Sequence, residues 1–150
     1  MMIRNRILMV IVFIVIMTGC GMDLDKDGPP QANVQVKGEK VEAITGVFHW
    51  ETEGWFSTRA VVVDAPSSWQ MGEKMEGTMV GEGDIATISF SDDSNPRVTA
   101  FVWKDAEHGK RLPITGNELK LPTESGKHVI ELTAIWENGE ASYTIVVDVK

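Results

Sequence analysis

The chain has 150 residues, and its 14 Lys and Arg against 22 Asp and Glu give a formal net charge of −8. This charge disfavours nucleic acid or an anionic membrane surface as the main partner, because their phosphate groups would repel the protein. The single cysteine excludes an intrachain disulfide and a metal site built from cysteines. The apolar content of 43% is that of an ordinary globular protein and argues against wholesale disorder.

Residues 1–19 have the pattern of a secretory signal peptide. Arg4 and Arg6 form a positive start, and an apolar run over residues 7–17 follows them. At about 1.5 Å per residue this run covers roughly 16 Å, which is too short for the roughly 30 Å hydrocarbon core of a membrane. The segment is therefore expected to direct secretion and to be removed, which implies an extracytoplasmic protein.

The end of this segment resembles the lipobox of bacterial lipoproteins. Thr18, Gly19 and Cys20 match the last three positions of that motif, and Met17 stands where Leu is usual. The resemblance implies that the Cys20 thiol receives a diacylglyceryl group and that the signal peptide is cut between Gly19 and Cys20. Two acyl chains attach a protein stably to a membrane, whereas one holds it only marginally. We therefore expect a lipoprotein, with acyl chains such as palmitate, anchored on the extracytoplasmic face of the cell membrane.

Residues 20–40 are expected to be the lipidated cysteine and a flexible acidic linker, since they contain a Pro-Pro pair and no aromatic residue. Within them, Asp23, Asp25 and Asp27 with Gly28 match the first half of an EF-hand calcium loop. Val34 occupies the position at which that loop requires a bidentate Glu. A solvated acidic spacer is the favoured interpretation, and calcium binding at the three aspartates stays open.

Residues 41–150 are expected to fold as an all-β domain, an immunoglobulin-like antiparallel β-sandwich. Short runs rich in Val, Ile, Thr, Phe and Trp alternate there with turn-forming residues. A one-turn helix over residues 67–72, capped by Ser67, is expected between two of them. The predicted strands are 42–50, 56–63, 77–80, 85–90, 98–104, 111–114, 118–121, 127–137 and 141–149. With no disulfide to join the sheets, the core is expected to form from aliphatic side chains and from Phe48, Trp50, Phe90, Phe101, Trp103, Trp136 and Tyr143.

The last two strands predict a β-hairpin. Asn138-Gly139 is the strongest short signal for a two-residue type I′ turn. This turn would place Trp136 opposite Ala141 and Ala134 opposite Tyr143. In this register apolar residues face apolar residues along the whole ladder, whereas a slip by one residue would bring polar side chains to the buried face.

A second hairpin is expected to join the strands 42–50 and 56–63. A five-residue loop over residues 51–55 would pair Trp50 with Phe56 and Phe48 with Thr58. This register keeps one face of both strands apolar, whereas a four-residue loop would bury the charge of Arg59.

The tip of this second hairpin is the candidate binding site. Trp55 would lie there beside the carboxylates of Glu51 and Glu53, and aromatic anchors dominate the energetics of protein interfaces. The alternative is that Trp55 folds back over the sheet edge as a lid on the core, because an indole buries much apolar area. Trp69 is a second candidate contact residue.

Five segments of the body resemble small lipoproteins of Bacillus-type Gram-positive bacteria. They are residues 46–50 (GVFHW), 63–67 (VDAPS), 98–103 (VTAFVW), 126–136 (GKHVIELTAIW) and 139–143 (GEASY). The resemblance implies a surface-anchored immunoglobulin-like domain of a family whose function is uncharacterised, and it carries no catalytic residue to this chain.

Catalytic and metal-binding patterns are weak in this sequence. His49, His108 and His128 do not have the spacing that would direct two imidazoles to one metal, so no metal site and no cofactor are predicted. Ser67 or Ser68 could be combined with a histidine and an aspartate, but no nucleophile elbow supports a hydrolase. The sequence therefore favours a protein that is not an enzyme.

The functional hypothesis from sequence is a lipid-anchored, non-enzymatic binding or accessory module of the bacterial cell envelope. Its partners would be the membrane, through the lipid on Cys20, and an envelope protein or cell-wall component. One alternative is a carbohydrate or cell-wall binder that stacks sugar rings on Trp55 and Trp69. The other is a structural subunit that adds a strand to a partner at an exposed sheet edge.

Overall fold

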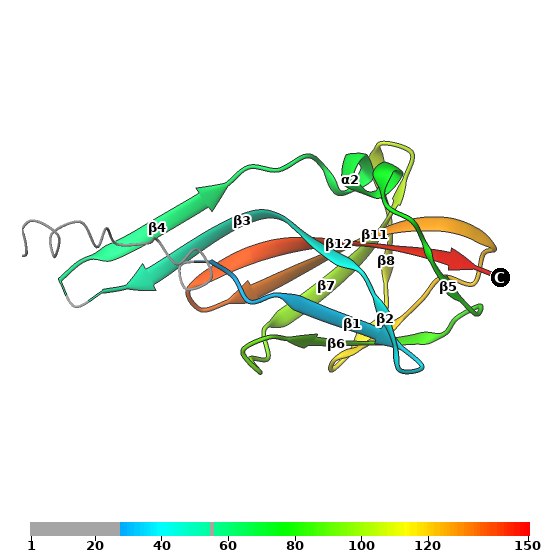
Figure 1. The fold of residues 1–150 in the computed structure, drawn as a ribbon, viewed down its shortest axis with the longest axis horizontal. Coiled ribbons are helices and arrows are strands. Elements are labelled where there is room, and N and C mark those ends of the chain that lie inside the picture. Colours follow the sequence, from blue (N-terminus) through cyan, green and yellow to red (C-terminus); the bar gives the residue numbers. More distant parts are fainter. Residues whose placement is uncertain (1–27, 55) are drawn as a thin grey trace, which may run out of the picture.

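Two β-sheets pack face to face in the computed structural model, which describes residues 28–54 and 56–150 (Figure 1). The smaller, five-stranded sheet has the order β2 (Glu39–Val41), β1 (Ala32–Val36), β6 (Ile85–Phe90), β10 (Glu118–Lys120) and β9 (Ile114–Thr115). The larger, seven-stranded sheet has the order β4 (Thr58–Val63), β3 (Ala43–Glu53), β12 (Gly139–Val149), β11 (Gly126–Trp136), β7 (Arg97–Lys104) and β8 (Glu107–Leu112), with β5 (Thr78–Val80) parallel to β12. All other strand pairs are antiparallel, which confirms the prediction of an all-β sandwich.

The main core lies between the two sheets and is built by period-2 alternation along the strands. On the long strands β11 and β12, Ile130, Leu132 and Ile145 are at most 1% exposed. Across the interface, Val34 of β1 and Leu119 of β10 are fully buried. Side chains of a strand point alternately to its two faces, so the strands that line the interface give every second residue to this core.

A second, smaller cluster covers the outer face of the seven-stranded sheet. It forms between that sheet and the single described helix, α2 (Ser68–Lys74), and contains Met75, Val129 and Val146. Gly72 lets the helix approach closely, because a Cβ atom at this position would lie 2.5 Å from the methyl groups of Val129. The predicted cap is confirmed: the Ser67 hydroxyl accepts a hydrogen bond from the Gln70 amide at 3.3 Å, and the Gln70 side chain binds back to Ser67 in a capping box.

The segment over residues 32–40 corrects the prediction of a flexible linker up to Lys40. It forms β1 and β2, and Val34 pairs with Ile88 of β6 in the five-stranded sheet. Tyr143 donates a hydrogen bond to the carbonyl of Pro30 at 2.5 Å, so the chain is held even before β1 begins. The signal that was missed is the strict alternation of small apolar residues in β1, which is enough for a half-buried strand without any aromatic residue.

Tyr143 lies at the centre of the packed region. Burial raises the pKa of its hydroxyl well above the ordinary range, with a further contribution from the Asp92 carboxylate. The group therefore remains a neutral donor to Pro30 throughout the physiological range. Its ring lies 5.9 Å from that of Phe90, which in turn meets Trp136 edge to face at 5.0 Å.

Phe101 and Trp103 are a second correction, because they do not belong to the main core. Alternation along β7 directs Val98, Ala100 and Val102 to that core, and the odd-numbered residues therefore point to the outer face. Trp103 packs there against the smaller cluster beneath α2. Alternate residues of β7 thus pack on opposite faces of the sheet, whereas the sequence prediction assigned residues of both faces to one core.

The C-terminal hairpin forms with the predicted faces but a different register. Trp136 lies opposite Gly139, and Ala134 lies opposite Ala141, so residues 137 and 138 form the turn. Neither has a positive φ angle, whereas a type I′ turn requires two. The reason is the pairing of β12 with β3. A Cβ atom at Gly139 would collide with the carbonyl of His49, so the glycine is needed for this pairing rather than for the turn.

The other hairpin, β3–β4, is longer than predicted. Trp50 pairs with Val61 and Phe48 with Val63, in place of the expected partners Phe56 and Thr58. Residues 51–53 belong to β3 rather than to a loop, and the chain reverses between Gly54 and Ser57, whose backbone groups bond at 2.9 Å. The observed register keeps the face of Trp50 apolar at Phe48–Val63 and Trp50–Val61, and it extends the ladder to Glu53 with a tighter turn, where Arg59 lies opposite Thr52 in the projecting part of the hairpin.

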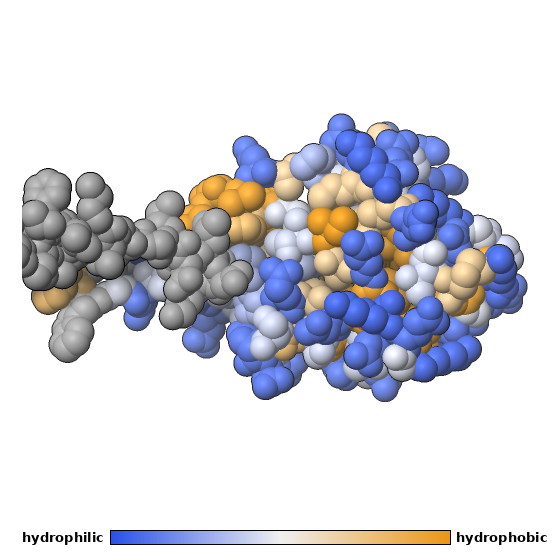
Figure 2. Space-filling model, viewed as in Figure 1, coloured by the Kyte–Doolittle hydropathy of each residue, from blue (hydrophilic) through white to orange (hydrophobic). Residues whose placement is uncertain are grey.

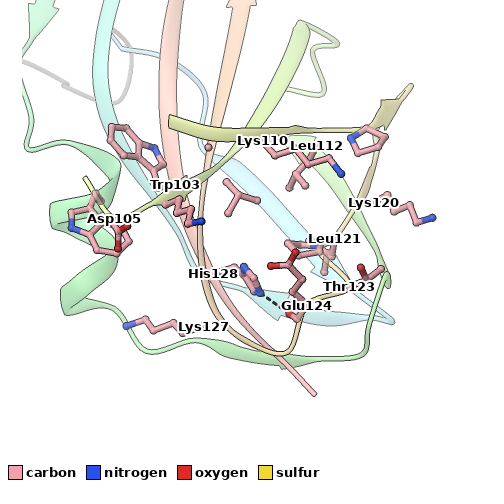
Figure 3. Close-up of a pocket in the computed structure, with 16 residues that line it drawn as sticks. Trp103, Asp105, Lys110, Leu112, Lys120, Leu121, Thr123, Glu124, Lys127 and His128 are labelled. Atoms are coloured by element: carbon pink, nitrogen blue, oxygen red, sulfur yellow. Dashed lines mark hydrogen bonds between the residues drawn. The ribbon is translucent and has the colours of Figure 1, made fainter. Parts of the chain in front are cut away.

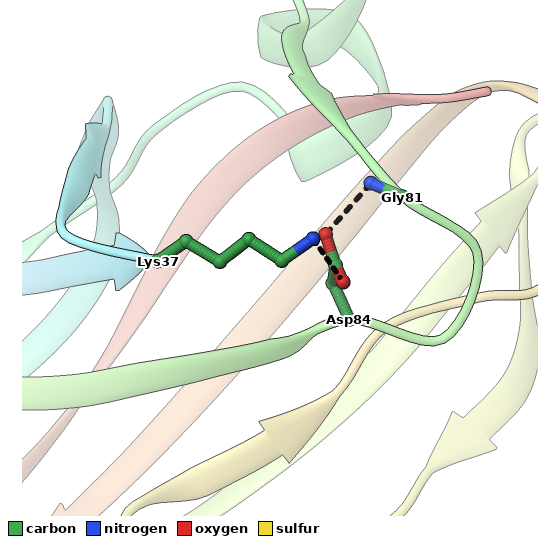
Figure 4. A network of polar contacts seen from close by, with 3 residues as sticks. All are labelled: Lys37, Gly81 and Asp84. Carbon is green, nitrogen blue, oxygen red and sulfur yellow. Dashed lines mark hydrogen bonds and ion pairs between the residues drawn. The ribbon is translucent and has the colours of Figure 1, made fainter.

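A polar contact ties the β1–β2 turn to the turn before β6 (Figure 4). Lys37 has a φ angle of 51°, and its ammonium lies 2.8 Å from one carboxylate oxygen of Asp84. The Gly81 amide donates to the other oxygen at 2.7 Å. The Lys37 ammonium, followed by the Gly81 amide, holds the pKa of Asp84 below its ordinary value.

Candidate functional site

The β3–β4 hairpin projects beyond the rest of the sandwich (Figure 1). On its inner side, the pairing of β3 with β12 reaches only to Trp50. The last links are at Glu51, whose amide donates to the carbonyl of Asn138 at 2.8 Å and whose carbonyl accepts from the Asn138 side chain at 3.1 Å. Beyond this point, the described residues Thr52 and Glu53 pair only with β4, so the outer part of the hairpin stands free of the sheet.

Strand β4 forms one edge of the seven-stranded sheet and carries an exposed apolar surface. Val62 is 67% exposed, Val63 is 37% exposed, and Phe56, just before the strand, is 97% exposed. Figure 2 shows the corresponding hydrophobic patch over β4. An edge strand also presents backbone donors and acceptors that no neighbouring strand uses.

The opposite edge of the same sheet is different in character. Strand β8 has the sequence EHGKRL, in which charged residues alternate closely with the others. Charged side chains on an edge strand discourage pairing with another chain, and β4, with the sequence TRAVVV, has only Arg59. The chemistry of the two edges therefore favours β4 as the one that accepts another strand.

Glu51 and Glu53, two of the predicted site residues, lie on this hairpin. Both are exposed and on the same face of β3, together with His49. The His49 Nε2 atom lies 3.8 Å from a carboxylate oxygen of Glu51, at the outer limit of an ion pair between half-exposed groups. Trp55, the third predicted residue of this site, lies outside the described residues.

Trp69, the fourth predicted residue, belongs to a different place. It lies on α2 and lines a cleft together with Trp103 of β7. The structure therefore does not bring Trp69 together with Glu51 and Glu53. Sequence reasoning missed Trp103 as a partner of Trp69, although the period-2 pattern of β7 could have placed it on the outer face.

The Trp103 indole is held in place by hydrogen bonds at the outer face. Its Nε1 group donates to a carboxylate oxygen of Glu131 at 3.1 Å. The hydroxyl of Ser68, which is 2% exposed at the start of α2, donates to the same oxygen at 2.7 Å. Glu131 thus joins α2, β7 and β11 and orients one wall of the cleft.

The remaining predictions concern residues at the N-terminus and the histidines. Gly19, Cys20 and the aspartates Asp23, Asp25 and Asp27 lie outside the described residues. Among residues 28–54 and 56–150, no group of three or more His, Cys, Asp or Glu side chains is arranged to hold a metal ion. In the same ranges, no helix has the length and apolarity needed to cross a membrane.

Comparisons of the chain with protein-family models, with curated proteins and with solved structures gave no match. The similarity to small Bacillus-type lipoproteins therefore rests on the segments quoted from the sequence alone.

Proposed function

We propose that the protein is a lipid-anchored, non-enzymatic binding module of the bacterial cell envelope, and that it docks onto a partner protein through the edge of β4. The lipobox-like segment ending at Cys20 supports the anchor and the extracytoplasmic location. The observation that carries the docking role is the projecting β3–β4 hairpin, whose edge strand exposes a row of valines.

Docking would proceed by strand addition, in which an extended segment of the partner pairs with the free edge of β4. Main-chain hydrogen bonds would supply affinity, and alternate side chains of the added segment would supply specificity. On one face the added segment would meet Val62 and the neighbouring carboxylates of Glu51 and Glu53. These charges favour a partner segment that carries Lys or Arg at alternate positions among apolar residues.

Burial of the exposed side chains would contribute most of the affinity. Fully burying a valine or phenylalanine side chain is worth roughly 1.5–3 kcal/mol, so Val62 and Phe56 together offer a useful part of a micromolar interaction, which is about 8 kcal/mol. The same groups contribute little to the stability of the isolated domain, because they stay in water there.

The docking role can be tested by photo-crosslinking in bacterial cells that make the lipidated protein. A photoreactive residue replaces Val62 in one strain and Ile85, another aliphatic residue that is 45% exposed, in the control strain. We expect crosslinking to one discrete protein from position 62 and none from position 85. The crosslinked product should disappear when Val61→Lys is added to the strain with the photoreactive residue at position 62. Equal crosslinking at both positions, or none at position 62, would contradict the proposal.

The anchor can be tested separately by feeding the cells an alkyne analogue of palmitate. The wild-type protein should be labelled, and mass spectrometry should find a diacylglyceryl group on Cys20 at the new N-terminus. The Cys20→Ser variant should lose the label and be released from the membrane fraction. An intact leader with an unmodified thiol in the wild-type protein would refute the anchor.

A further inference from the structure

The cleft beside α2 is a second feature, separate from the hairpin. It lies where α2, the β7–β8 hairpin and the segment between β10 and β11 meet, and its volume is about 630 Å³. Small-molecule sites have volumes of roughly 300–1,000 Å³ and combine apolar walls with a few polar groups. Val102, Leu112 and Leu121 supply apolar lining here.

The two ends of the cleft differ in chemistry. Figure 3 shows the Trp103 indole with Asp105 and Lys127 on one side of the cleft and the side chains of Lys110 and Lys120 on the other, with His128 and Glu124 between them. Trp69 adds a second indole to the lining. A ligand that spans the cleft would therefore meet indoles on one side and the ammonium groups of Lys110 and Lys120 on the other, and its anionic group would lie away from the carboxylates of Asp105 and Glu124.

The lining is basic in an acidic protein. It contains four lysines and two carboxylates, which leaves 10 basic against 20 acidic residues in the rest of the chain. The Lys127 ammonium already donates to the carbonyl of Met75 at 2.8 Å. Lys104, Lys110 and Lys120 are exposed, and in the part of the chain that the structure describes their ammonium groups make no side-chain hydrogen bond or ion pair. These three can neutralise an anionic ligand.

His128 adds a group suited to a hydroxyl. Its Nε2 atom lies 2.6 Å from the carbonyl oxygen of Glu124, and because a carbonyl only accepts, Nε2 carries the proton in this contact. In the neutral ring the other nitrogen, Nδ1, is then an acceptor. A ligand that carries hydroxyl groups can donate to it from within the cleft.

From this arrangement we propose that the cleft binds a short acidic glycan. A sugar ring would pack on the Trp69 and Trp103 end, its hydroxyls would bond to His128, and its carboxylate or phosphate would lie against Lys110 and Lys120. Indole faces offer apolar area to the C–H face of a sugar, and the hydroxyls of a sugar supply donors for Nδ1 of His128, which an aliphatic anion lacks. This site is independent of strand addition at β4.

Nuclear magnetic resonance titration of the purified folded protein tests the proposal, with the indole N–H signals as reporters. The probes are trigalacturonate, glucose 6-phosphate, neutral maltotriose and a triglutamate peptide. We expect trigalacturonate or glucose 6-phosphate, or both, to shift the Trp69 and Trp103 signals with a millimolar or tighter Kd that weakens with added salt. Whichever of the two binds more tightly identifies the anion as carboxylate or phosphate.

Charge-reversal variants locate the binding site. The double variant Lys110→Glu with Lys120→Glu should weaken binding at least tenfold. The control, Lys40→Glu with Lys150→Glu, has the same net charge and changes lysines that do not line the cleft, so it should bind within about twofold of the wild-type protein. The hairpin variant Val62→Lys should also bind normally, which separates this test from that of the proposed docking function.

Four results would overturn the proposal. The first three are the absence of indole shifts with both anionic sugars, equal binding of maltotriose, and equal weakening by the cleft and control variants. Triglutamate binding as tight as that of trigalacturonate would likewise remove the assignment to a glycan, because charge alone would then explain the contact.

Discussion

The two long hairpins of the seven-stranded sheet use similar residues for different purposes. In β11–β12, aliphatic residues such as Leu132 and Ile145 are buried, and both strands have neighbours on either side. In β3–β4, the valines of β4 face water, and the outer edge of that strand is unpaired within the described residues. Apolar alternation therefore identifies a strand face, and only the position in the sheet decides whether that face builds the core or remains available for contact.

The comparison predicts its largest effect at the centre of β11. Leu132→Ala should lower the free energy of unfolding by about 2–5 kcal/mol, because Leu132 is 1% exposed and truncation leaves a cavity. Urea unfolding followed by tryptophan fluorescence measures it. A loss below about 1 kcal/mol would show that the β11–β12 hairpin is not the packed region described here.

A smaller effect is expected from Tyr143→Phe, which keeps the ring and removes one donor. The Pro30 carbonyl would lose its hydrogen bond, at a cost of about 0.5–1.5 kcal/mol. Amide hydrogen exchange should show the greatest loss of protection in β1, which follows Pro30 in the chain. An unchanged stability and unchanged protection of β1 would mean that this contact does not hold the N-terminal strand.

At the end of the sandwich away from the hairpin, we expect the contribution of Asp84 to stability to depend on pH. Its pKa is lowered in the folded protein by Lys37 and Gly81, so the stabilisation is present above the unfolded-state pKa of about 3.9 and is lost as the pH falls through the folded value. Asp84→Asn should therefore be less stable than the wild-type protein at pH 7, and the two should converge at an acidic pH below the folded-state pKa of Asp84. Asp64→Asn, a change at an exposed residue of the β4–α2 connection, is the control and should be nearly neutral at pH 7. A constant difference between Asp84→Asn and the wild-type protein at both pH values would contradict the argument.

The smallest effect on stability is expected on β4 itself. Val62→Thr should change the free energy of unfolding by no more than about 0.5 kcal/mol, because the side chain is 67% exposed. The same variant should reduce crosslinking to the partner that we propose for β4. A loss of stability comparable to that of Leu132→Ala would show that β4 is part of the core after all.

Much of this fold could be predicted from local patterns. The sandwich, the cap at Ser67 and the buried faces of β11 and β12 follow from period-2 alternation and capping chemistry, which are properties of short segments. The register of the C-terminal hairpin could not be predicted, because Gly139 is required by close contact with β3 and not by the turn beside it. The β1 strand could have been predicted from the alternation of its apolar residues, but its pairing with β6 could not, because the two strands are distant in the chain.

The candidate sites could be predicted only in part, for a similar reason. Glu51 and Glu53 were predicted in the loop of the β3–β4 hairpin and lie instead on β3, close to the end of the same hairpin. The pairing of Trp69 with Trp103 depends on α2 packing on the outer sheet face, through Gly72 and the shared contact of Ser68 with Glu131. The spacing of residues within one segment cannot predict a contact between two segments that are distant in the chain.

The central claim is that β4 is an edge kept open for another strand, and hydrogen–deuterium exchange tests it most directly. The protein is measured once after purification and once in the envelope fraction in which we propose that it is anchored. The β4 peptide Thr58–Val63 is compared with the β6 peptide Ile85–Phe90, whose strand is paired on both sides. We predict fast exchange of the β4 peptide in the purified protein, marked protection in the envelope, and no change in the β6 peptide. Equal exchange of the β4 peptide in both states would contradict the account.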